Sequence, residues 1–334
     1  MGSDMQLRPG LVSVVVPIFN LDPSLLDRCL DSIAKQTYQS IEILVVDDGS
    51  RSDLLNGYEE VVRRHSMARL FTIEHSGVSA ARNEGMRQAK GEYLSFVDAD
   101  DFVKPNMVET LVENMRAFNA DVSCVISEIH QLSGRTTYDS SRAESALCWS
   151  REESLVAFFS GRLSESACGK LFKTANVASI EFPVGRSVCE DASFVFNALM
   201  GSDLVVLSAT PLYCYVRREG SATKSGFSEK EFGVIDSGEE MVAEVSIREP
   251  GLVPFAFAYL LGKHLCCLRT MRRDKTYMKR NRASYLTLKT KIRDFRSERE
   301  ALPLTSKQQI ELFFAVRPAW MYGLFVNLFD FLRR

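Results

Sequence analysis

Short, mainly apolar runs alternate with segments of helical periodicity along the first 130 residues. An apolar run without polar alternation predicts a strand that is buried on both faces. Such runs occur at 12–16, 41–48, 70–74, 93–98 and 122–127. Helical patterns or helix-start signals separate them, at about 25–33, 52–65, 78–90 and after Pro105. This alternation predicts an α/β fold with a mainly parallel sheet and helices on both faces.

Length and charge divide the chain into two parts. At about 100–200 residues per domain, 334 residues correspond to about two domains. We assign residues 1–228 to the α/β domain and 229–334 to a helical region, interrupted at Pro250 and Pro254. The net charge of −2 hides an asymmetry, because residues 263–334 hold 17 basic and 6 acidic residues. A region this basic is suited to an anionic surface.

Polar side chains follow four of the predicted strands at the point where each strand ends. In a parallel α/β sheet, ligands bind in the crevice outside the carboxyl ends of the strands. The pattern therefore predicts a ligand site at that edge. The residues concerned are Asn20, Asp47, Asp48, His75, Asp98, Asp100 and Asp101.

The strongest chemical signal is the run Asp98-Ala99-Asp100-Asp101 after a buried strand. Carboxylates gathered in this way repel one another unless a cation compensates them. Oxygen ligands suit Mg²⁺ or Mn²⁺, which commonly completes its shell with water and substrate phosphates. A diphosphate-bearing substrate is the natural partner. The alternative is structural: Asp100 or Asp101 would cap the helix that begins near Pro105.

The run Asp47-Asp48-Gly49-Ser50 also allows two interpretations. It can be a turn followed by a helix cap, or a carboxylate that accepts hydrogen bonds from a base or ribose. The sequence has no G-x-G-x-x-G after the first strand and no G-x-x-x-x-G-K-[ST], which disfavours a Rossmann dinucleotide site and a P-loop.

Several motifs in order resemble family 2 glycosyltransferases. They are V-S-V-V-V-P-I-F-N at 12–20, C-L-D-S-I-x-x-Q-T at 29–37, I-E-I-L-V-V-D-D-G-S at 41–50, H-S-G-V-S-A-A-R-N-E-G at 75–85, G-E-Y-L-S-F-V-D-A-D-D at 91–101, G-K-L-F at 169–172, E-D-A-S-F at 190–194 and R-E-G-S-A-T at 218–223. The resemblance spans about residues 11–225. It implies an inverting, metal-dependent enzyme of the GT-A fold, of the bacterial type that builds capsular and exopolysaccharide repeats.

The resemblance implies a donor nucleotide site at the first strand ends. Pro17, Phe19 and Asn20 would border the nucleotide, with Phe19 packed on the base. Asp48 would contact the edge of the base, and Arg82 would lie near the base or the diphosphate.

The same resemblance assigns the acidic motif. Asp98 and Asp100 would form the D-x-D metal site, with Asp100 the stronger ligand and Asp98 also near the ribose. Asp101 would contact the donor sugar or support the metal ligands. Mn²⁺ or Mg²⁺ is the implied cofactor.

Three residues farther along complete the implied site. Asp191 matches the catalytic base, and Lys170 and Arg218 would contact sugar or phosphate. Inverting transfer needs one base to accept the acceptor's hydroxyl proton, so a carboxylate remote in sequence from the metal group suits the role. The alternative is again a helix cap. Family members often have Asn at the position of Gly169, which leaves that contact open.

The C-terminal tail after Leu312 is rich in aromatic residues beside Lys and Arg. It is too short and too broken to span a bilayer but suits an interfacial element on an anionic leaflet. We therefore expect a cytoplasmic protein held peripherally on the inner face of the cell membrane. The alternative is that these aromatic residues pack on the catalytic domain as an ordinary core helix. The basic stretch has no recognisable nucleic-acid-binding motif, so nucleic acid is not expected as a partner.

The remaining features favour a reducing compartment. The eight cysteines are scattered, with no C-x-x-C pair, which is typical of reduced, buried thiols and gives no zinc-ligand spacing. No signal peptide and no membrane-spanning apolar run are expected.

Together these features predict transfer of a sugar from a nucleotide diphosphate sugar, UDP-linked by expectation, to a saccharide or lipid-linked acceptor. Two alternatives stay open. A sugar-1-phosphate nucleotidyltransferase would need a glycine-rich basic loop after the first strand, and 18–22 reads Ile-Phe-Asn-Leu-Asp instead. A non-catalytic nucleotide-sugar-binding scaffold would have lost Asp98, Asp100 or Asp191, and all three are present.

Overall fold

The structure, a computed structural model, describes residues 7–131, 136–138, 146–186, 188–217, 227–297 and 302–332. The chain forms two compact units. The first unit comprises residues 1–155 and 164–221, and the second comprises 156–163 and 222–334. The division lies close to the boundary expected at 228, with the short segment 156–163 added to the second unit.

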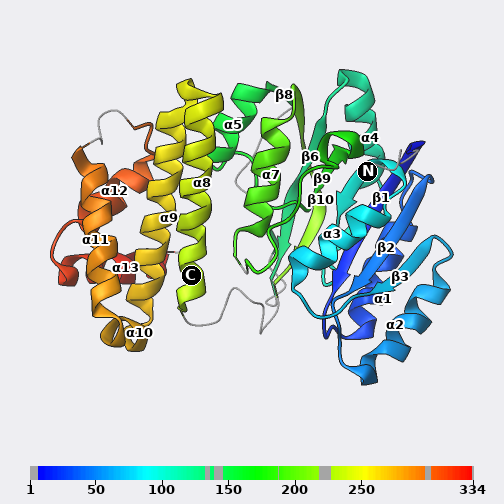
Figure 1. Ribbon diagram of the computed structural model, residues 1–334, viewed down its shortest axis with the longest axis horizontal. Helices are drawn as coiled ribbons and strands as arrows, with labels where there is room; N and C mark the ends of the chain where they lie inside the picture. The colour runs from blue at the N-terminus through cyan, green and yellow to red at the C-terminus, as the bar shows by residue number, and fades with distance from the viewer. Residues whose placement is uncertain are drawn as a thin grey trace. The chain divides into compact units, whose positions relative to one another are not determined.

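A ten-stranded mixed sheet forms the centre of the first unit, in the order β3-β2-β1-β4-β9-β6-β10-β5, with β7 on β6 and β8 on β10 (Figure 1). The predicted runs are strands β1, β2, β3, β4 and β6, and β1 pairs in parallel with both β2 and β4. The expected α/β class is confirmed. The strands are β1 (Arg8–Ile18), β2 (Ile41–Asp47), β3 (Ala68–Thr72), β4 (Gly91–Phe96), β5 (Phe102–Val103), β6 (Val122–His130), β7 (Thr136–Tyr138), β8 (Leu147–Ser150), β9 (Lys170–Lys173) and β10 (Leu204–Val216).

Sequence periodicity missed the short antiparallel strands. Strand β9 inserts antiparallel between β4 and β6, and the two-residue strand β5 pairs with β10. Strands of two to four residues carry too few side chains for a periodic signal. They nevertheless bring the chain after β4 and the chain after β9 to the same part of the sheet.

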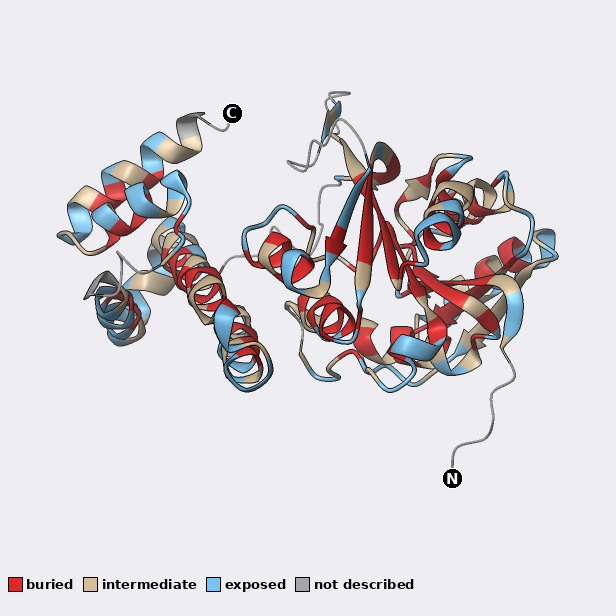
Figure 2. Ribbon diagram, turned by 90° about the horizontal axis from the view of Figure 1, so that it is seen from above, coloured by how far each residue is buried: buried red, intermediate tan, exposed pale blue. Residues whose placement is uncertain are grey.

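Helices lie on both sides of this sheet (Figure 1), and its strands are mostly buried (Figure 2). Helix α3 lies especially close to β1, because a Cβ added at Gly85 would sit 2.3 Å from Cγ1 of Val15. A glycine at that point lets the helix approach the strand. The helices are α1 (Pro23–Ala34), α2 (Ser52–Arg64), α3 (Val78–Gln88), α4 (Met107–Phe118), α5 (Arg151–Phe159), α6 (Thr174–Val177) and α7 (Glu190–Met200).

The second unit is helical and has its own apolar core. Helix α9 is central to it, with Leu261, Leu268 and Met271 fully buried. Its elements are η2 (Glu229–Phe232), α8 (Gly233–Arg248), η3 (Pro250–Leu252), α9 (Val253–Arg273), α10 (Lys275–Arg280), α11 (Arg282–Ser297), α12 (Ser306–Ala315) and α13 (Ala319–Leu332). The expected helical extension is present.

We expect no uncharged apolar run of membrane-spanning length, and one segment, which includes Lys263 and Arg269, is nevertheless apolar on average over such a length. Residues Pro250–Arg273 form a helical segment long and apolar enough to cross a membrane, by length and composition. Of its most apolar 18-residue window, 56% is buried inside the protein. A core helix of a soluble unit passes the same test, and the burial of Leu261, Leu265 and Leu268 fits that description.

A buried ion pair holds the C-terminal helices in this core. The Arg269 guanidinium contacts both carboxylate oxygens of Glu311, and the Tyr322 hydroxyl donates to Glu311 Oε1 at 3.0 Å. Because Tyr322 is on α13, that helix is docked by a satisfied buried polar group as well as by apolar packing. Part of the aromatic tail is therefore core, but of the second unit and not of the catalytic domain on which the structural alternative placed it.

All eight cysteines are free, in line with the expectation of reduced thiols. Burial was expected for them as a class, and this is wrong for Cys148 and Cys266, which are exposed.

Candidate active site

The ends of β1, β2 and β3 lie together through contacts between their loops. The ring of Phe19, which is 46% exposed, stacks on the ring of His75 with centroids 4.2 Å apart. Asn20 has a positive φ of 47°, and its Oδ1 accepts from the Arg51 backbone N–H at 2.9 Å. The result is an accessible aromatic platform beside the first strand ends.

Asp48 supports this aromatic platform from its buried side. Its carboxylate is 2% exposed and accepts hydrogen bonds from the backbone N–H groups of Ser76 and Gly77, at 2.8 and 2.9 Å. His75 Nδ1 lies 2.8 Å from Asp48 Oδ2. The predicted contact of Asp48 with a base stays a prediction, since the carboxylate already organises the turn that begins α3.

The acidic run after β4 is tied to the far end of β10. The Tyr213 hydroxyl donates to Asp101 Oδ2 at 2.6 Å and accepts from the Asp98 backbone N–H at 3.2 Å. The Val216 N–H donates to Asp101 Oδ1 at 2.8 Å. Burial, together with the charge of Asp98, raises the pKa of Asp101 to about 8. Asp101 therefore fixes the loop, while Asp98 and Asp100 are half-buried beside it.

Arg82 is the centre of the site. Its guanidinium is 3% exposed and contacts three carboxylates, namely Asp98 at 3.0 Å, Glu190 at 3.2 Å and Asp191 at 2.5 Å. Burial lowers the pKa of Arg82, but the carboxylates outweigh burial and the net shift is upward. The Phe182 ring packs over the guanidinium with a centroid distance of 5.2 Å. Arg82 thus joins the strand-end acids to the start of α7.

Asp191 lies in the first turn of α7, after Cys189, which has a positive φ of 58°. Its Oδ2 accepts from the Ala167 backbone N–H at 3.2 Å and from the Ser166 hydroxyl at 3.3 Å. Burial raises the pKa of Asp191 and the Arg82 cation opposes this rise. A positioned carboxylate with a raised pKa is what a general base near neutral pH requires.

Other predicted residues are placed less directly. Lys170 is buried, and its ammonium donates to the Ser166 carbonyl at 2.5 Å, so its contact with phosphate stays a prediction. Pro17 is half-buried near the end of β1. Arg218 lies outside the described residues. Gly169 has φ of +70°, a conformation that Gly and Asn tolerate best, which accounts for either residue at this position.

Sequence reasoning gave no site role to Tyr213 or to Ser166. Tyr213 is one apolar-looking member of a strand, and Ser166 lies in an irregular segment. Nothing in their local pattern indicates a site, because their role depends on contacts with residues more than 20 positions away. Glu190 lies in the first turn of α7, and sequence reasoning assigned it no site role.

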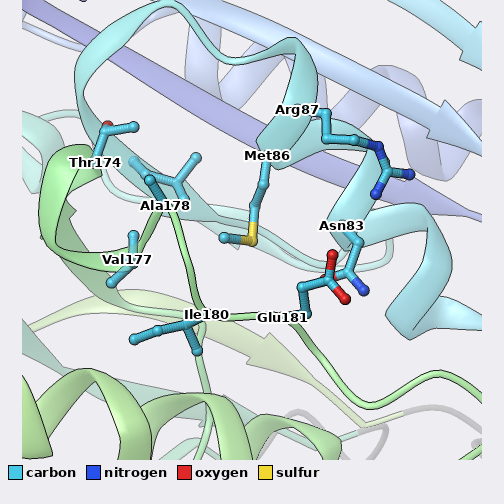
Figure 3. Close-up of a pocket in the computed structure, with 9 residues that line it drawn as sticks. Asn83, Met86, Arg87, Thr174, Val177, Ala178, Ile180 and Glu181 are labelled. Atoms are coloured by element: carbon cyan, nitrogen blue, oxygen red, sulfur yellow. The ribbon is translucent and has the colours of Figure 1, made fainter. Parts of the chain in front are cut away.

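Two other features of the described residues include no predicted site residue. A 340 Å³ pocket is lined mainly by α3 and the segment around α6, and includes Asn83, Met86 and Glu181 but no predicted site residue (Figure 3). The side chains of Glu128, His130 and Cys214 place ligand atoms within 4.8 Å of one another. Within this group Glu128 also pairs with the Lys104 ammonium.

Comparison with known proteins decides the family. The Glycosyl transferase family 2 model matches residues 13–172, and GlyG, a glycosyltransferase of Streptococcus pneumoniae, is 34% identical over 233 residues, which cover 65% of this chain and 74% of GlyG. The chain belongs to glycosyltransferase family 2. The resemblance seen in the motifs is thereby confirmed.

Two further comparisons extend over more of the chain than the matched family model. GlyA of S. pneumoniae is 28% identical over 311 residues, which are 89% of this chain but 42% of GlyA. The crystal structure of S. aureus TarS 1-349 in complex with UDP-GlcNAc superposes with a TM-score of 0.74 at 22% identity, covering 96% of this chain and 91% of that one. At this identity the likeness shows the fold, which is the GT-A-like fold expected together with its helical C-terminal region.

The Tyr213 hydroxyl gives a first prediction for this family 2 site. Tyr213→Phe removes the hydrogen bond to buried Asp101 and leaves the Asp98 N–H without its acceptor. We expect the free energy of unfolding to fall by about 1–3 kcal/mol, measured by urea denaturation. Tyr285→Phe is the control, because its buried hydroxyl has no hydrogen-bond partner among the described residues. Equal losses in the two variants would contradict the role given to Tyr213.

Proposed function

We propose that this chain transfers a glycosyl group, with inversion, from a UDP-linked sugar to a saccharide or lipid-linked acceptor in cell-surface polysaccharide synthesis. One observation carries the proposal. Arg82 brings Asp98, at the end of β4, and Asp191, at the start of α7, to a single guanidinium in a family 2 fold. A donor-side acid and an acceptor-side base thus lie within one side chain's reach.

In this proposal Asp191 is the general base. The acceptor hydroxyl oxygen attacks the anomeric carbon, the bond from that carbon to the diphosphate oxygen breaks, and the hydroxyl proton passes to Asp191. The Ala167 N–H, the Ser166 hydroxyl and Arg82 hold the carboxylate in place. The nucleoside diphosphate leaves with the bonding electron pair.

The residues fit a divalent cation. Asp98 and Asp100 are half-buried oxygen donors in one loop, and the loop is fixed through Asp101 by Tyr213 and Val216. Such a donor set suits Mg²⁺ or Mn²⁺. When bound, the cation would neutralise charge that develops on the leaving diphosphate.

The stacked pair of Phe19 and His75 supports a nucleotide at the other side of the site. An exposed aromatic face offers stacking to a base. UDP-GlcNAc is present in the TarS complex, and we extend a UDP-linked donor to this chain on that likeness. The identity of the sugar is left to experiment.

Thermal stabilisation by nucleotide sugars tests the proposal. We expect a UDP-sugar with Mn²⁺ to raise the free energy of unfolding by about 2.7 kcal/mol at 100 times its Kd. The same panel with EDTA, and with GDP-mannose, should give less stabilisation. The absence of stabilisation by any nucleotide sugar, with or without metal, would contradict the proposed donor site.

A further inference from the structure

The outer face of α13 is apolar. Trp320, Leu324 and Leu328 follow one another at intervals of four residues and are 64%, 61% and 59% exposed. Residues four apart lie on one side of a helix. The inner side of α13 carries Tyr322 and Val326, which are buried in the core of the second unit. In Figure 2 the helix nearest the C-terminus shows exposed surface along its length.

Helix α13 carries almost no charged side chains that would make its outer face favourable in water. Its sequence, Ala319–Leu332, contains a single charged residue, Asp330, and this residue pairs with Arg273. A solvent-facing helix normally carries charged residues opposite its buried stripe. A helix that is apolar all round is expected to be covered on both sides.

The neighbouring helix extends the apolar surface. On α12, Ile310 is 54% and Phe313 is 44% exposed. Helices α12 and α13 pack on each other, with Phe314 stacked on Phe325, and both pack on α9, so their exposed sides point away from that helix. We call Ile310, Phe313, Trp320, Leu324 and Leu328 the α12–α13 apolar face. Large apolar side chains exposed on two packed helices mark a site of interaction.

Basic side chains border this face. The Arg317 guanidinium lies over the Phe313 ring at 4.6 Å, and the Lys307 ammonium lies 5.2 Å from the centroid of Phe329. The two acids of these helices, Glu311 and Asp330, are paired with Arg269 and Arg273. Residues 263–334 carry 17 basic and 6 acidic residues in all.

The basic charge around the α12–α13 apolar face determines which kind of partner fits it. A second copy of the chain would bring two strongly basic regions together, which like-charge repulsion disfavours. A nucleic acid would compensate the basic charge, but Trp320, Leu324 and Leu328 would then lie against its polar sugar-phosphate backbone. An anionic lipid surface suits both the basic and the apolar side chains, because its headgroups attract Lys and Arg and its acyl boundary accepts apolar side chains.

We propose that the α12–α13 apolar face docks on an anionic membrane surface, with its exposed side chains entering the headgroup and acyl boundary. The proposal concerns the second unit and does not depend on glycosyl transfer. It accounts for the two kinds of tail residue: Tyr322 and Val326 hold the helix in the core, while Trp320 and its neighbours meet the lipid.

Trp320 provides a direct reporter. The chain has two tryptophans, and the other, Trp149, is 7% exposed and belongs to the first unit. In the full chain we expect vesicles of equal phosphatidylglycerol and phosphatidylcholine to shift the emission to shorter wavelength and to protect it from acrylamide. Pure phosphatidylcholine vesicles should bind at least tenfold less protein. Trp149→Phe should leave the shift intact, which assigns it to Trp320.

A matched pair of variants tests the face itself. Leu324→Glu/Leu328→Glu is expected to reduce flotation with the anionic vesicles at least tenfold. Val184→Glu/Ile247→Glu adds the same charge at exposed apolar positions outside the face, 59% and 79% exposed, and should float like the wild type. All four positions are exposed, so far-ultraviolet circular dichroism and the Tm should be unchanged.

Three outcomes would overturn the proposal. The first is equal flotation of the two double variants. The second is a Trp320 shift that occurs without vesicles and grows with protein concentration together with a dimer mass, which would make the face a contact between copies. The third is an equal Trp320 shift produced by a DNA or RNA oligonucleotide in place of vesicles.

Discussion

Asp191→Asn is expected to lower the rate of glycosyl transfer by about 10²–10⁴-fold, the usual contribution of a general base. Asparagine keeps the shape of the side chain and one oxygen for Arg82, but it cannot accept the acceptor's proton. The loss should therefore fall on kcat, measured as UDP released per unit time. The affinity for the donor, measured by thermal stabilisation, should change by no more than a few-fold.

The matched control for this variant is Asp203→Asn. Asp203 is also an aspartate of the first unit, but its side chain is 90% exposed and pairs with Arg151 at the surface. We expect wild-type turnover from it. Wild-type turnover by Asp191→Asn would refute the assignment of the base. Donor binding with no turnover in the wild type, across a broad set of acceptors, would instead support the nucleotide-sugar-binding scaffold.

The fold could be predicted from sequence wherever a strand is long and buried on both faces. Strands β1 and β2 consist largely of apolar residues, so their existence and burial follow from the pattern, and the alternation with helices predicts their parallel direction. Strands β5 and β9 could not be predicted in this way. They are two and four residues long and are set by pairing with β10, β4 and β6 rather than by local preference.

The candidate site also depends on contacts that the local sequence does not reveal. The resemblance named Arg82, Asp98 and Asp191, but it placed Arg82 near the base or diphosphate and did not predict its contacts with three carboxylates. Gly85 lets α3, which carries Arg82, lie tightly on β1, and Cys189, with a positive φ, precedes α7, which carries Glu190 and Asp191. Distances between residues about 100 positions apart have no local signature.

Removal of the Arg82 charge is expected to have the second large effect. In Arg82→Met the carboxylates of Asp98, Glu190 and Asp191 lose their shared cation in a buried setting. Breaking a buried ion pair from one side costs about 3–5 kcal/mol of stability, because the remaining charges are uncompensated. We expect a loss of this size in urea denaturation. Arg82→Lys keeps the charge but cannot fork between three carboxylates, so it should lose less stability.

A double variant separates this electrostatic role from simple packing. If Arg82 compensates Asp191, then Arg82→Met/Asp191→Asn should be less destabilised than the sum of the two single variants, by about 0.5–3 kcal/mol of coupling. Additive losses would show that Arg82 acts through packing on Phe182 instead.

The pH dependence of the lysine variant gives an independent reading of the same contact. Arg82 lowers the pKa of Asp191 against the larger upward effect of burial. A weaker contact in Arg82→Lys therefore raises that pKa further, and the ionised base forms at higher pH. The acid limb of kcat/KM should move to higher pH in this variant, while Asp203→Asn should leave it unchanged. An unmoved acid limb in Arg82→Lys would mean that the guanidinium positions the acids without tuning the base.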